Sequence, residues 1–360
     1  VALLLEENVA RKYIRSVDLA GDELSAGSWP YVAAVDELRR RVKGAHRLGV
    51  TVHAGESFRW ELQGVRSVGE LLVPVRRVDR IGHALSLDED VAEIIVGSGP
   101  SMVDTRSVID DLCWLIHANI KADEAAEFLD RVLAKVQFDE LDLDSDDLVE
   151  AWLSRWSWSE LAQATGSTPG DFPASTSWIP DYLSRGLRSF DNRPSRALVT
   201  LCYHGKGAEA VLDRSVGADL SDEFLEWSAT VAPVAREVVK VAIKDKDVVV
   251  EACPTSNMRL SGLRLMKHLP LHDWWEFGMR VSLNSDDPLV FGHTVADEAA
   301  AVQRAFSTTL VEAMAKTSVD TCGNGLRPQG SRAYANAAAT IGSAWPVGED
   351  RSGGQDPGGP

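Results

Sequence analysis

In VTVHAGE, residues 50–56, a short apolar run ends in a histidine, two small residues and a glutamate. Similar runs ending in polar loops are YIRSVDLAG at 13–21, VDRIGHA at 78–84, DVVVEACP at 247–254 and RVSLNSDDP at 280–288. Each is apolar almost throughout, as expected for a strand that is covered on both faces. The sequence therefore predicts five short buried strands, each followed by a polar loop.

A helical pattern separates the first two predicted strands. In VAAVDELRRRVKGAHRLG, residues 32–49, apolar side chains recur every three or four positions until Gly49 ends the pattern. Strand, helix and strand over about 30 residues make a βαβ unit. The steps from Asp18 to His53 and from His53 to His83, 35 and 30 residues, each fit one such unit.

One step is far too long for a single unit. His83 and Ala252 are 169 residues apart, which leaves roughly 140 residues beyond one unit. We therefore expect an insertion from about residue 97 to about residue 217. The predicted organisation is a first barrel part at 1–97, a helical insertion at 98–217, a second barrel part at 218–320 and a disordered tail at 321–360.

The predicted insertion contains helical patterns and a group of tryptophans. The helical patterns are VIDDLCWLIHANI at 108–120 and DEAAEFLDRVLAKV at 123–136, and the tryptophans are Trp152, Trp156, Trp158 and Trp178. Trp152 and Trp156 are four residues apart, a spacing that places them on one helix face and favours core packing. An exposed aromatic patch for self-association is the alternative.

Composition limits the partners and the compartment. A formal charge of −17 over 360 residues repels nucleic acid and anionic lipid, so a small neutral or weakly polar ligand is expected. The four cysteines, Cys113, Cys202, Cys253 and Cys322, have no CxxC spacing and indicate reduced thiols in a cytoplasmic protein. No apolar run approaches the roughly 20 residues that span a bilayer.

Regular βα units with polar residues at the carboxyl ends of their strands predict an α/β fold, the TIM (β/α)₈ barrel, whose active site is built from those loops. Five units are visible, and three are missing from the amino-terminal side. His53 and Glu56 follow the second strand, His83 the third, and Asp286 and Asp287 the fifth. Histidine and aspartate from different strands commonly hold a divalent metal, usually zinc (Zn²⁺).

Taken in order, VDLAGDE, TVHAGE, RIGHA, EACPTSN and SLNSDDP resemble the carboxyl half of the adenosine and AMP deaminase family. The resemblance covers about residues 1–97 and 218–300. It implies a zinc-dependent (β/α)₈ barrel that hydrolyses the 6-amino group of adenine nucleosides to an inosine-type product and ammonia.

The resemblance also implies roles for single residues. His53 and Asp286 would bind zinc, and Asp286 would also orient the attacking water. His83 would either take a proton from this water or steer its approach. Glu56 would be the protonated acid at purine N1, which requires a raised pKa. The backbone N–H of Gly21 would approach N3, where a side chain would obstruct the ring.

Asp287 would contact N7 according to the same resemblance. Asp286 and Asp287, just before Pro288, could instead form a helix cap and turn. Gly21 could be an ordinary tight turn. His46, His117, His268 and His272 are expected to be structural, while His204 follows a strand-like run, ALVTLCYHG at 197–205, and is a weak candidate for a substitute ligand.

The sequence departs from the family in one important respect. The family's zinc site also uses a His-x-His pair on the first barrel strand, and no such pair occurs in these 360 residues. We therefore expect a fragment of a longer protein, with weakened zinc affinity and two unpaired sheet edges. An evolved pseudoenzyme would leave the presence of Glu56, His83 and both aspartates unexplained.

The large insertion resembles that of the adenosine deaminases of bacterial antiphage RADAR-type systems. This looser resemblance implies a homo-oligomeric shell built through the insertion, with an ATPase partner. Two further hypotheses remain open. The substrate could be AMP or adenine, or the chain could be a non-catalytic oligomerising assembly module.

Overall fold

The computed structural model describes residues 16–24, 27–41, 48–73, 77–97, 103–138, 143–157, 159–160, 193–202, 212 and 214–321. Several sequence predictions lie outside these residues. They concern the tail at 322–360, Trp158, Trp178, Cys322, His46 and His204.

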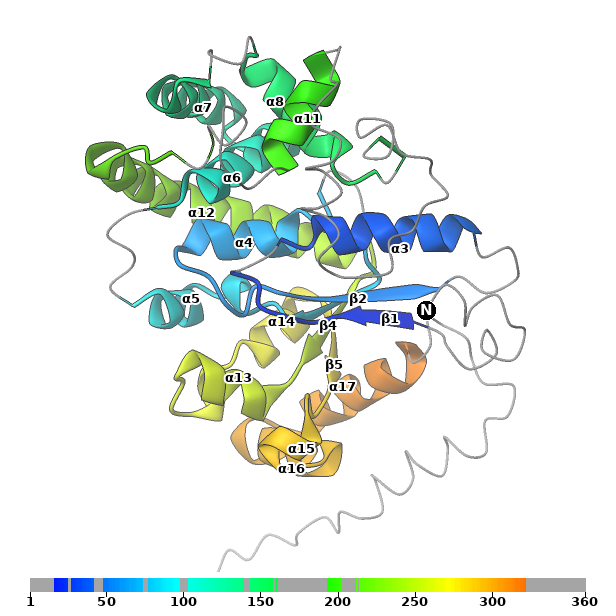
Figure 1. Ribbon diagram of the computed structural model, residues 1–360. Coiled ribbons are helices and arrows are strands. Elements are labelled where there is room, and N and C mark those ends of the chain that lie inside the picture. The colour runs from blue at the N-terminus through cyan, green and yellow to red at the C-terminus, as the bar shows by residue number, and fades with distance from the viewer. Residues whose placement is uncertain are drawn as a thin grey trace, which may run out of the picture.

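All five predicted strands are present and form one parallel sheet in chain order (Figure 1). Their bounds are β1 Ser16–Leu19, β2 Gly49–Ala54, β3 Arg80–His83, β4 Val249–Ala252 and β5 Arg280–Leu283. Neighbouring strands pair without exception in the parallel sense, so all their carboxyl ends lie at one edge of the sheet. This mixed α/β arrangement agrees with part of a (β/α) barrel.

Strand β1 differs from the buried strand that the sequence predicted. Its residues alternate between exposed and half-buried, whereas the residues of β2 are buried except for the half-buried His53. Among the described residues, β1 pairs only with β2 and forms an edge of the sheet. Its exposed residues, Ser16 and Asp18, are polar, and its half-buried residues, Val17 and Leu19, are apolar, so the sequence of β1 is that of a strand covered on one face.

Three helices pack near β1 and β2 on one side of the sheet (Figure 1). They are α3 Trp29–Arg41, α4 Glu61–Gly69 and α12 Ala218–Asp245. Helix α3 confirms the helical pattern predicted between the first two strands. Val65 and Val68 of α4 and Val239 of α12 are fully buried in the same apolar core as Val50 and Ile81 of the sheet.

Short helices follow the later strands. They are η1 Leu85–Leu87, α5 Glu89–Val96, α13 Pro254–Ser261, η4 Met266–His268, α14 Leu271–Phe277, α15 Pro288–Phe291, α16 Val295–Ala305 and α17 Thr308–Thr321. Helix α17 packs beside β5 (Figure 1). Ser318 of α17 fixes this position, because its hydroxyl accepts from the backbone N–H of Leu283 at 3.1 Å.

Four more helices form a group beyond α4 and α12 (Figure 1). They are α6 Thr105–Ala118, α7 Ala122–Val136, α8 Ser145–Ser154 and α11 Arg193–Cys202. Helices α6 and α7 confirm the two helical patterns. The prediction of a strand-like run at 197–205 is wrong for its described part, because residues 197–202 lie in α11, which packs against α8.

The tryptophans of this helical group are packed in a core. Trp152 is fully buried and Trp156 is 3% exposed, and their rings meet edge to face with centroids 6.2 Å apart. Trp156 lies just beyond the end of α8 rather than on its face. His117 also has a structural role, because its ring stacks on Trp152 and its Nε2 lies 2.7 Å from the carbonyl oxygen of Val149.

Within the described part of the chain, no helix combines the length and the apolar character that crossing a bilayer requires.

Candidate active site

The parallel sheet brings reactive side chains from distant parts of the chain to one edge. His53 is the penultimate residue of β2, and His83 is the last residue of β3. Cys253 directly follows β4, and Asp286 lies three residues beyond β5. The arrangement follows from the register, which pairs His53 with Gly82 and Ala54 with His83.

The two histidines are in direct contact. Nδ1 of His53 lies 3.1 Å from Nε2 of His83, and Nδ1 of His83 lies 2.7 Å from Oδ1 of Asn257 on α13. Because an amide oxygen only accepts, His83 must donate through Nδ1. Burial lowers the pKa of His83, so Nε2 of the neutral ring carries a lone pair and accepts from His53.

The other ring nitrogen of His53, Nε2, faces Asp18, whose Oδ1 is 3.6 Å away. Burial alone would disfavour the charged imidazole of His53. The interaction with Asp18 and the negative charges of Asp286 and Glu56 outweigh burial and raise the pKa of His53. The site therefore concentrates negative charge around His53, as a cation site does.

Glu56 lies beside this histidine pair. Its Oε1 is 3.4 Å from Nδ1 of His83, is buried, and has no hydrogen-bond partner among the described residues. Burial, reinforced by the charge of Asp286 and opposed by that of His53, raises the pKa of Glu56 to about 7. A buried carboxyl group with this pKa can hold a proton at neutral pH and donate it to a ligand.

The backbone of the turn that carries Glu56 is held by a second glutamate. The carboxylate of Glu23, in the loop after β1, accepts from the backbone N–H of Gly55 at 2.8 Å and of Glu56 at 3.1 Å. Burial raises the pKa of Glu23, while these two N–H groups oppose the rise. Glu23 thus ties the loops after the first two strands together.

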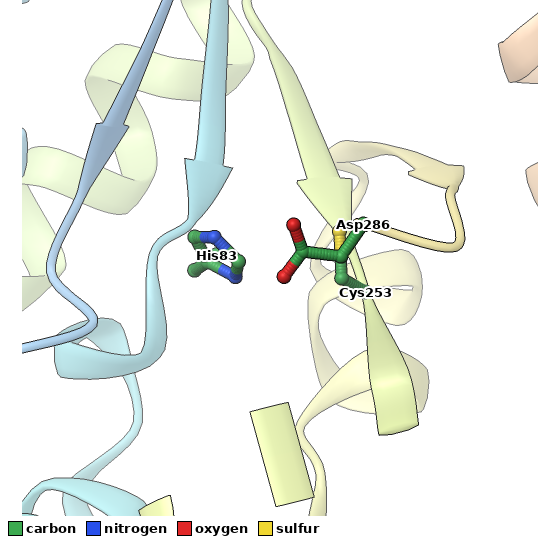
Figure 2. A group of neighbouring side chains, drawn as sticks. All are labelled: His83, Cys253 and Asp286. Atoms are coloured by element: carbon green, nitrogen blue, oxygen red, sulfur yellow. The ribbon is translucent and has the colours of Figure 1, made fainter. Parts of the chain in front are cut away.

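Asp286 completes the site from the opposite side. Figure 2 shows its carboxylate turned toward the ring of His83, with the sulfur of Cys253 beside it. One ligand atom from each of these three residues lies within 4.8 Å of the others, so they form a group able to hold a metal ion. Asp286 has a φ of 56°, a left-handed conformation that is uncommon outside glycine.

A cavity of about 370 Å³ opens beside His53, lined by Asp18, Gly21 and Glu23 among others. A Cβ atom placed on Gly21 would meet no atom of the described residues within 4 Å. Packing therefore does not require glycine at this position. The space beside its backbone is available to a ligand.

Asp287 has a well-defined local role. Its Oδ1 accepts from the backbone N–H of Leu289 at 2.9 Å and of Val290 at 3.2 Å, which caps α15. The helix-cap interpretation therefore describes Asp287 in this structure. A contact between Asp287 and a ligand is a separate proposal.

Sequence reasoning overlooked Asp18, Glu23, Asn257 and Cys253 as members of the site. All four lie inside the quoted motifs, Asp18 and Glu23 in VDLAGDE, Cys253 and Asn257 in EACPTSN. Their positions at or just after the ends of predicted strands could have indicated that they belong to the site. Their pairing with His53, Gly55 and His83 depends on side-chain directions that spacing does not give.

Comparison with known proteins gives matches to adenosine and adenine deaminases. A family model described as adenosine deaminase matches residues 234–322. An adenine deaminase of Aspergillus oryzae is 36% identical over 80 residues, 22% of each chain. An adenosine deaminase of Plasmodium falciparum is 33% identical over 72 residues, 20% of each chain.

A bacterial relative is also similar over a limited length. The adenine deaminase of Sinorhizobium fredii is 38% identical over 80 residues, which cover 22% of this chain and 25% of that protein. The chain thus spans only about a fifth to a quarter of the length of the curated relatives it matches. Over that part it is similar to enzymes that deaminate adenine compounds.

Proposed function

We propose that this chain carries the site of a zinc-dependent aminohydrolase that deaminates adenosine or a related adenine nucleoside or nucleotide. The products would be the inosine-type compound and ammonia. The observation that carries the proposal is Glu56, a half-buried carboxyl group with a pKa of about 7 beside the His53–His83 pair. One of its oxygens is buried and has no hydrogen-bond partner in the part of the chain that the structure describes.

The donor groups present fit a zinc ion. Imidazole nitrogen, carboxylate oxygen and cysteine sulfur are the atoms that zinc binds in proteins, and His83, Asp286 and Cys253 supply one of each within 4.8 Å. His53 supplies a second imidazole, in contact with that of His83. The negative charges that raise the pKa of His53 would equally attract a cation. His53 and Asp286 would hold the metal, and zinc, when bound, supplies Lewis-acid activation of water at neutral pH.

The chain's own residues would perform the remaining steps. Protonated Glu56 would donate to ring nitrogen N1 of the purine, which makes C6 more electrophilic. Neutral His83, held in one tautomer by Asn257, would steer the water toward C6, or would accept its proton through Nε2 once the bond from His53 to that nitrogen is released. The open backbone at Gly21 would receive the N3 edge of the ring, and Asp287 would approach N7.

Adenine is a second candidate substrate. Two of the three relatives described above are named adenine deaminases, one fungal and one bacterial. Assays with adenine, adenosine and AMP side by side would rank the three substrates. Assembly into a RADAR-type oligomeric shell through residues 98–217 is a further proposal, and gel filtration giving only monomer would contradict it.

The test of the proposal is substitution of Glu56. Glu56→Gln keeps the shape of the side chain but cannot transfer a proton, so adenosine deamination at saturating Zn²⁺ should fall by about two orders of magnitude or more. Glu93→Gln, on the solvent side of α5, serves as a matched control and should leave the rate unchanged. Equal rates for Glu56→Gln and the unmodified chain would contradict the assignment.

A further inference from the structure

Helix α13, which follows β4, begins without a cap from its own sequence. Cys253 precedes the helix and makes no side-chain cap hydrogen bond, and Pro254 at the first helical position has no N–H. The first N–H groups of a helix have no acceptor within the helix itself. The N–H of Thr255, the second residue of α13, therefore requires an acceptor from another part of the molecule.

A glutamate of α16 supplies that acceptor. Oε2 of Glu298 accepts from the backbone N–H of Thr255 at 3.1 Å, although the two residues are 43 positions apart in the chain. Helix α16 does not need this carboxylate for its own start, because Thr294 and Asp297 form a capping box there. Glu298 thus joins α16 to the first turn of α13.

The carboxyl group of Glu298 is buried and only partly satisfied. Its side chain is 1% exposed, and its Oε1 has no hydrogen-bond partner among the described residues. The imidazole of His293 is near, with Nε2 at 3.6 Å from Oε1. Burial raises the pKa of Glu298, while Thr255 and the charge of His293 oppose the rise. A partly satisfied buried carboxyl group lowers stability, so its presence points to a role beyond holding the fold.

The helix that Glu298 caps also contacts the proposed catalytic histidine. Asn257 of α13 is completely buried, and its Oδ1 lies 2.7 Å from Nδ1 of His83. The backbone N–H of Asn257 donates to the carbonyl oxygen of Cys253 at 2.8 Å, which places Asn257 in the first turn of the helix. Because an amide oxygen only accepts, the contact keeps the proton of the neutral His83 ring on Nδ1.

We infer that Glu298 is a positioning residue, whose carboxylate fixes the first turn of α13 so that Asn257 keeps the ring proton of His83 on Nδ1. Glu298 is not among the described residues that line the cavity beside His53, so it acts through the helix. The inference rests on the proposed function, because that function assigns His83 to the attacking water. It adds a buried carboxylate of α16 to the groups that determine the protonation of the site.

The test compares variants of the full chain that differ at one carboxyl group. Glu298→Met keeps most of the side-chain volume but has no oxygen acceptor, and apolar replacement of a buried charged group is often tolerated. Glu298→Gln keeps an oxygen that can accept from Thr255 and should restore the contact. Glu312→Gln is the matched control, because Glu312 is exposed on α17.

The first measurement is the ¹⁵N NMR spectrum of the histidine rings, in which the two neutral tautomers give different nitrogen shifts. His83→Gln identifies the signals of His83 by their absence. The unmodified chain, Glu298→Gln and Glu312→Gln should carry the proton on Nδ1, whereas Glu298→Met should show a mixture of both tautomers. This measurement needs no turnover, so its result is separate from that of the deamination assay.

Several results of this measurement would overturn the inference. They are an unchanged His83 spectrum in Glu298→Met, the same change in Glu312→Gln, or a proton on Nε2 in the unmodified chain. Glu298→Ala, which leaves the space open, is a second variant in case Glu298→Met does not fold. Failure of both variants to fold would assign Glu298 to the stability of the fold alone and would also overturn the inference.

Kinetics of deamination separate positioning from substrate binding. A misplaced catalytic group slows the chemical step, so Glu298→Met should lower kcat about tenfold and leave KM within about twofold. Asn257→Ala should lower kcat by a similar factor. The two changes together should lower it no further, because they break one series of contacts. Losses that multiply in the double variant would show that Glu298 does not act through Asn257.

Discussion

Among single residues, Glu56 and His83 have pKa values shifted in opposite directions, although Oε1 of Glu56 lies only 3.4 Å from Nδ1 of His83. Burial raises the pKa of Glu56 to about 7 and lowers that of His83. An acid must carry its proton to act, and a base must lack it. Both residues are therefore in the active form in one interval of pH, between the lowered pKa of His83 and the raised pKa of Glu56.

This pairing predicts a bell-shaped pH dependence of deamination. Activity should fall as pH rises through about 7, because Glu56 then loses its proton. It should also fall at acid pH, below the ordinary histidine value of 6.5, because His83 then becomes protonated. Initial rates across the pH range test this. The residual activity of Glu56→Gln should not decrease as pH rises through about 7. If that decrease persists in the variant, Glu56 is not the group that causes it.

Glu23 is predicted to stabilise the turn that carries Glu56. Glu23→Ala removes the acceptor of two backbone N–H groups and should lower the free energy of unfolding by about 1 to 3 kcal/mol. Glu23→Gln keeps one acceptor and should lose roughly half as much. Urea unfolding of both variants measures this, and an unchanged midpoint for Glu23→Ala would contradict the role of this carboxylate.

At the scale of elements, the close approach of β3 to β2 depends on glycine. A Cβ atom on Gly82 would lie 2.7 Å from Cδ2 of His53. Gly82→Ala should therefore displace the His53 ring and cost about 1 to 3 kcal/mol of stability through overpacking. Gly21→Ala is the control, since a Cβ there meets none of the described residues within 4 Å, and its melting temperature should not change. Equal melting temperatures for both variants would contradict this packing.

A buried charge network joins α4 to the helical group. Nε of Arg66 donates to Asp111 of α6 at 2.5 Å, and its Nη1 donates to Glu70 at 2.8 Å. Asp111 also accepts from the indole of Trp60 at 2.7 Å and is completely buried. The network therefore fixes α6 on α4 by directed bonds as well as by apolar packing.

Removing one member of this network leaves buried charge without a partner. Asp111→Ala should lower the free energy of unfolding by about 3 to 5 kcal/mol. Glu223→Ala, which breaks the exposed pair with Arg131, should leave it nearly unchanged. Chemical denaturation of both variants distinguishes the two environments, and similar midpoints would show that the network contributes little.

The sequence predicted the strands and several helices because their signals are local. Apolar runs bounded by glycine and polar residues placed all five strands within a few residues, and the period of α6 and α7 was visible in the sequence. The run at 197–202 is rich in residues that favour strands, yet it forms α11, because packing against α8 overrides local preference. The bonds of Asp18, Glu23 and Asn257 could not be predicted, since they depend on how loops from different strands approach each other.

At the scale of the whole molecule, one edge of a parallel sheet collects every proposed catalytic group. A cavity of about 530 Å³ adjoins the one of about 370 Å³ at this edge, and the two differ in their lining residues. The smaller one lies beside His53, and the larger one is lined by Arg66 of α4, Arg106 of α6, and three arginines that lie just outside helices, Arg59, Arg155 and Arg214. The helical group therefore contributes directly to the surroundings of the proposed site, through Arg106 of α6 and Arg155 after α8.

Metal dependence of the proposed reaction is tested by ammonia release from adenosine, adenine and AMP by the full chain. Metal is removed with a chelator and then restored as saturating Zn²⁺. We expect ammonia release from at least one of these compounds, and only when metal is present. His53→Ala and Asp286→Ala should abolish the release, whereas the control His268→Ala should retain it. An unchanged rate after chelation, full activity in His53→Ala, or no release from any of the three compounds would contradict the account.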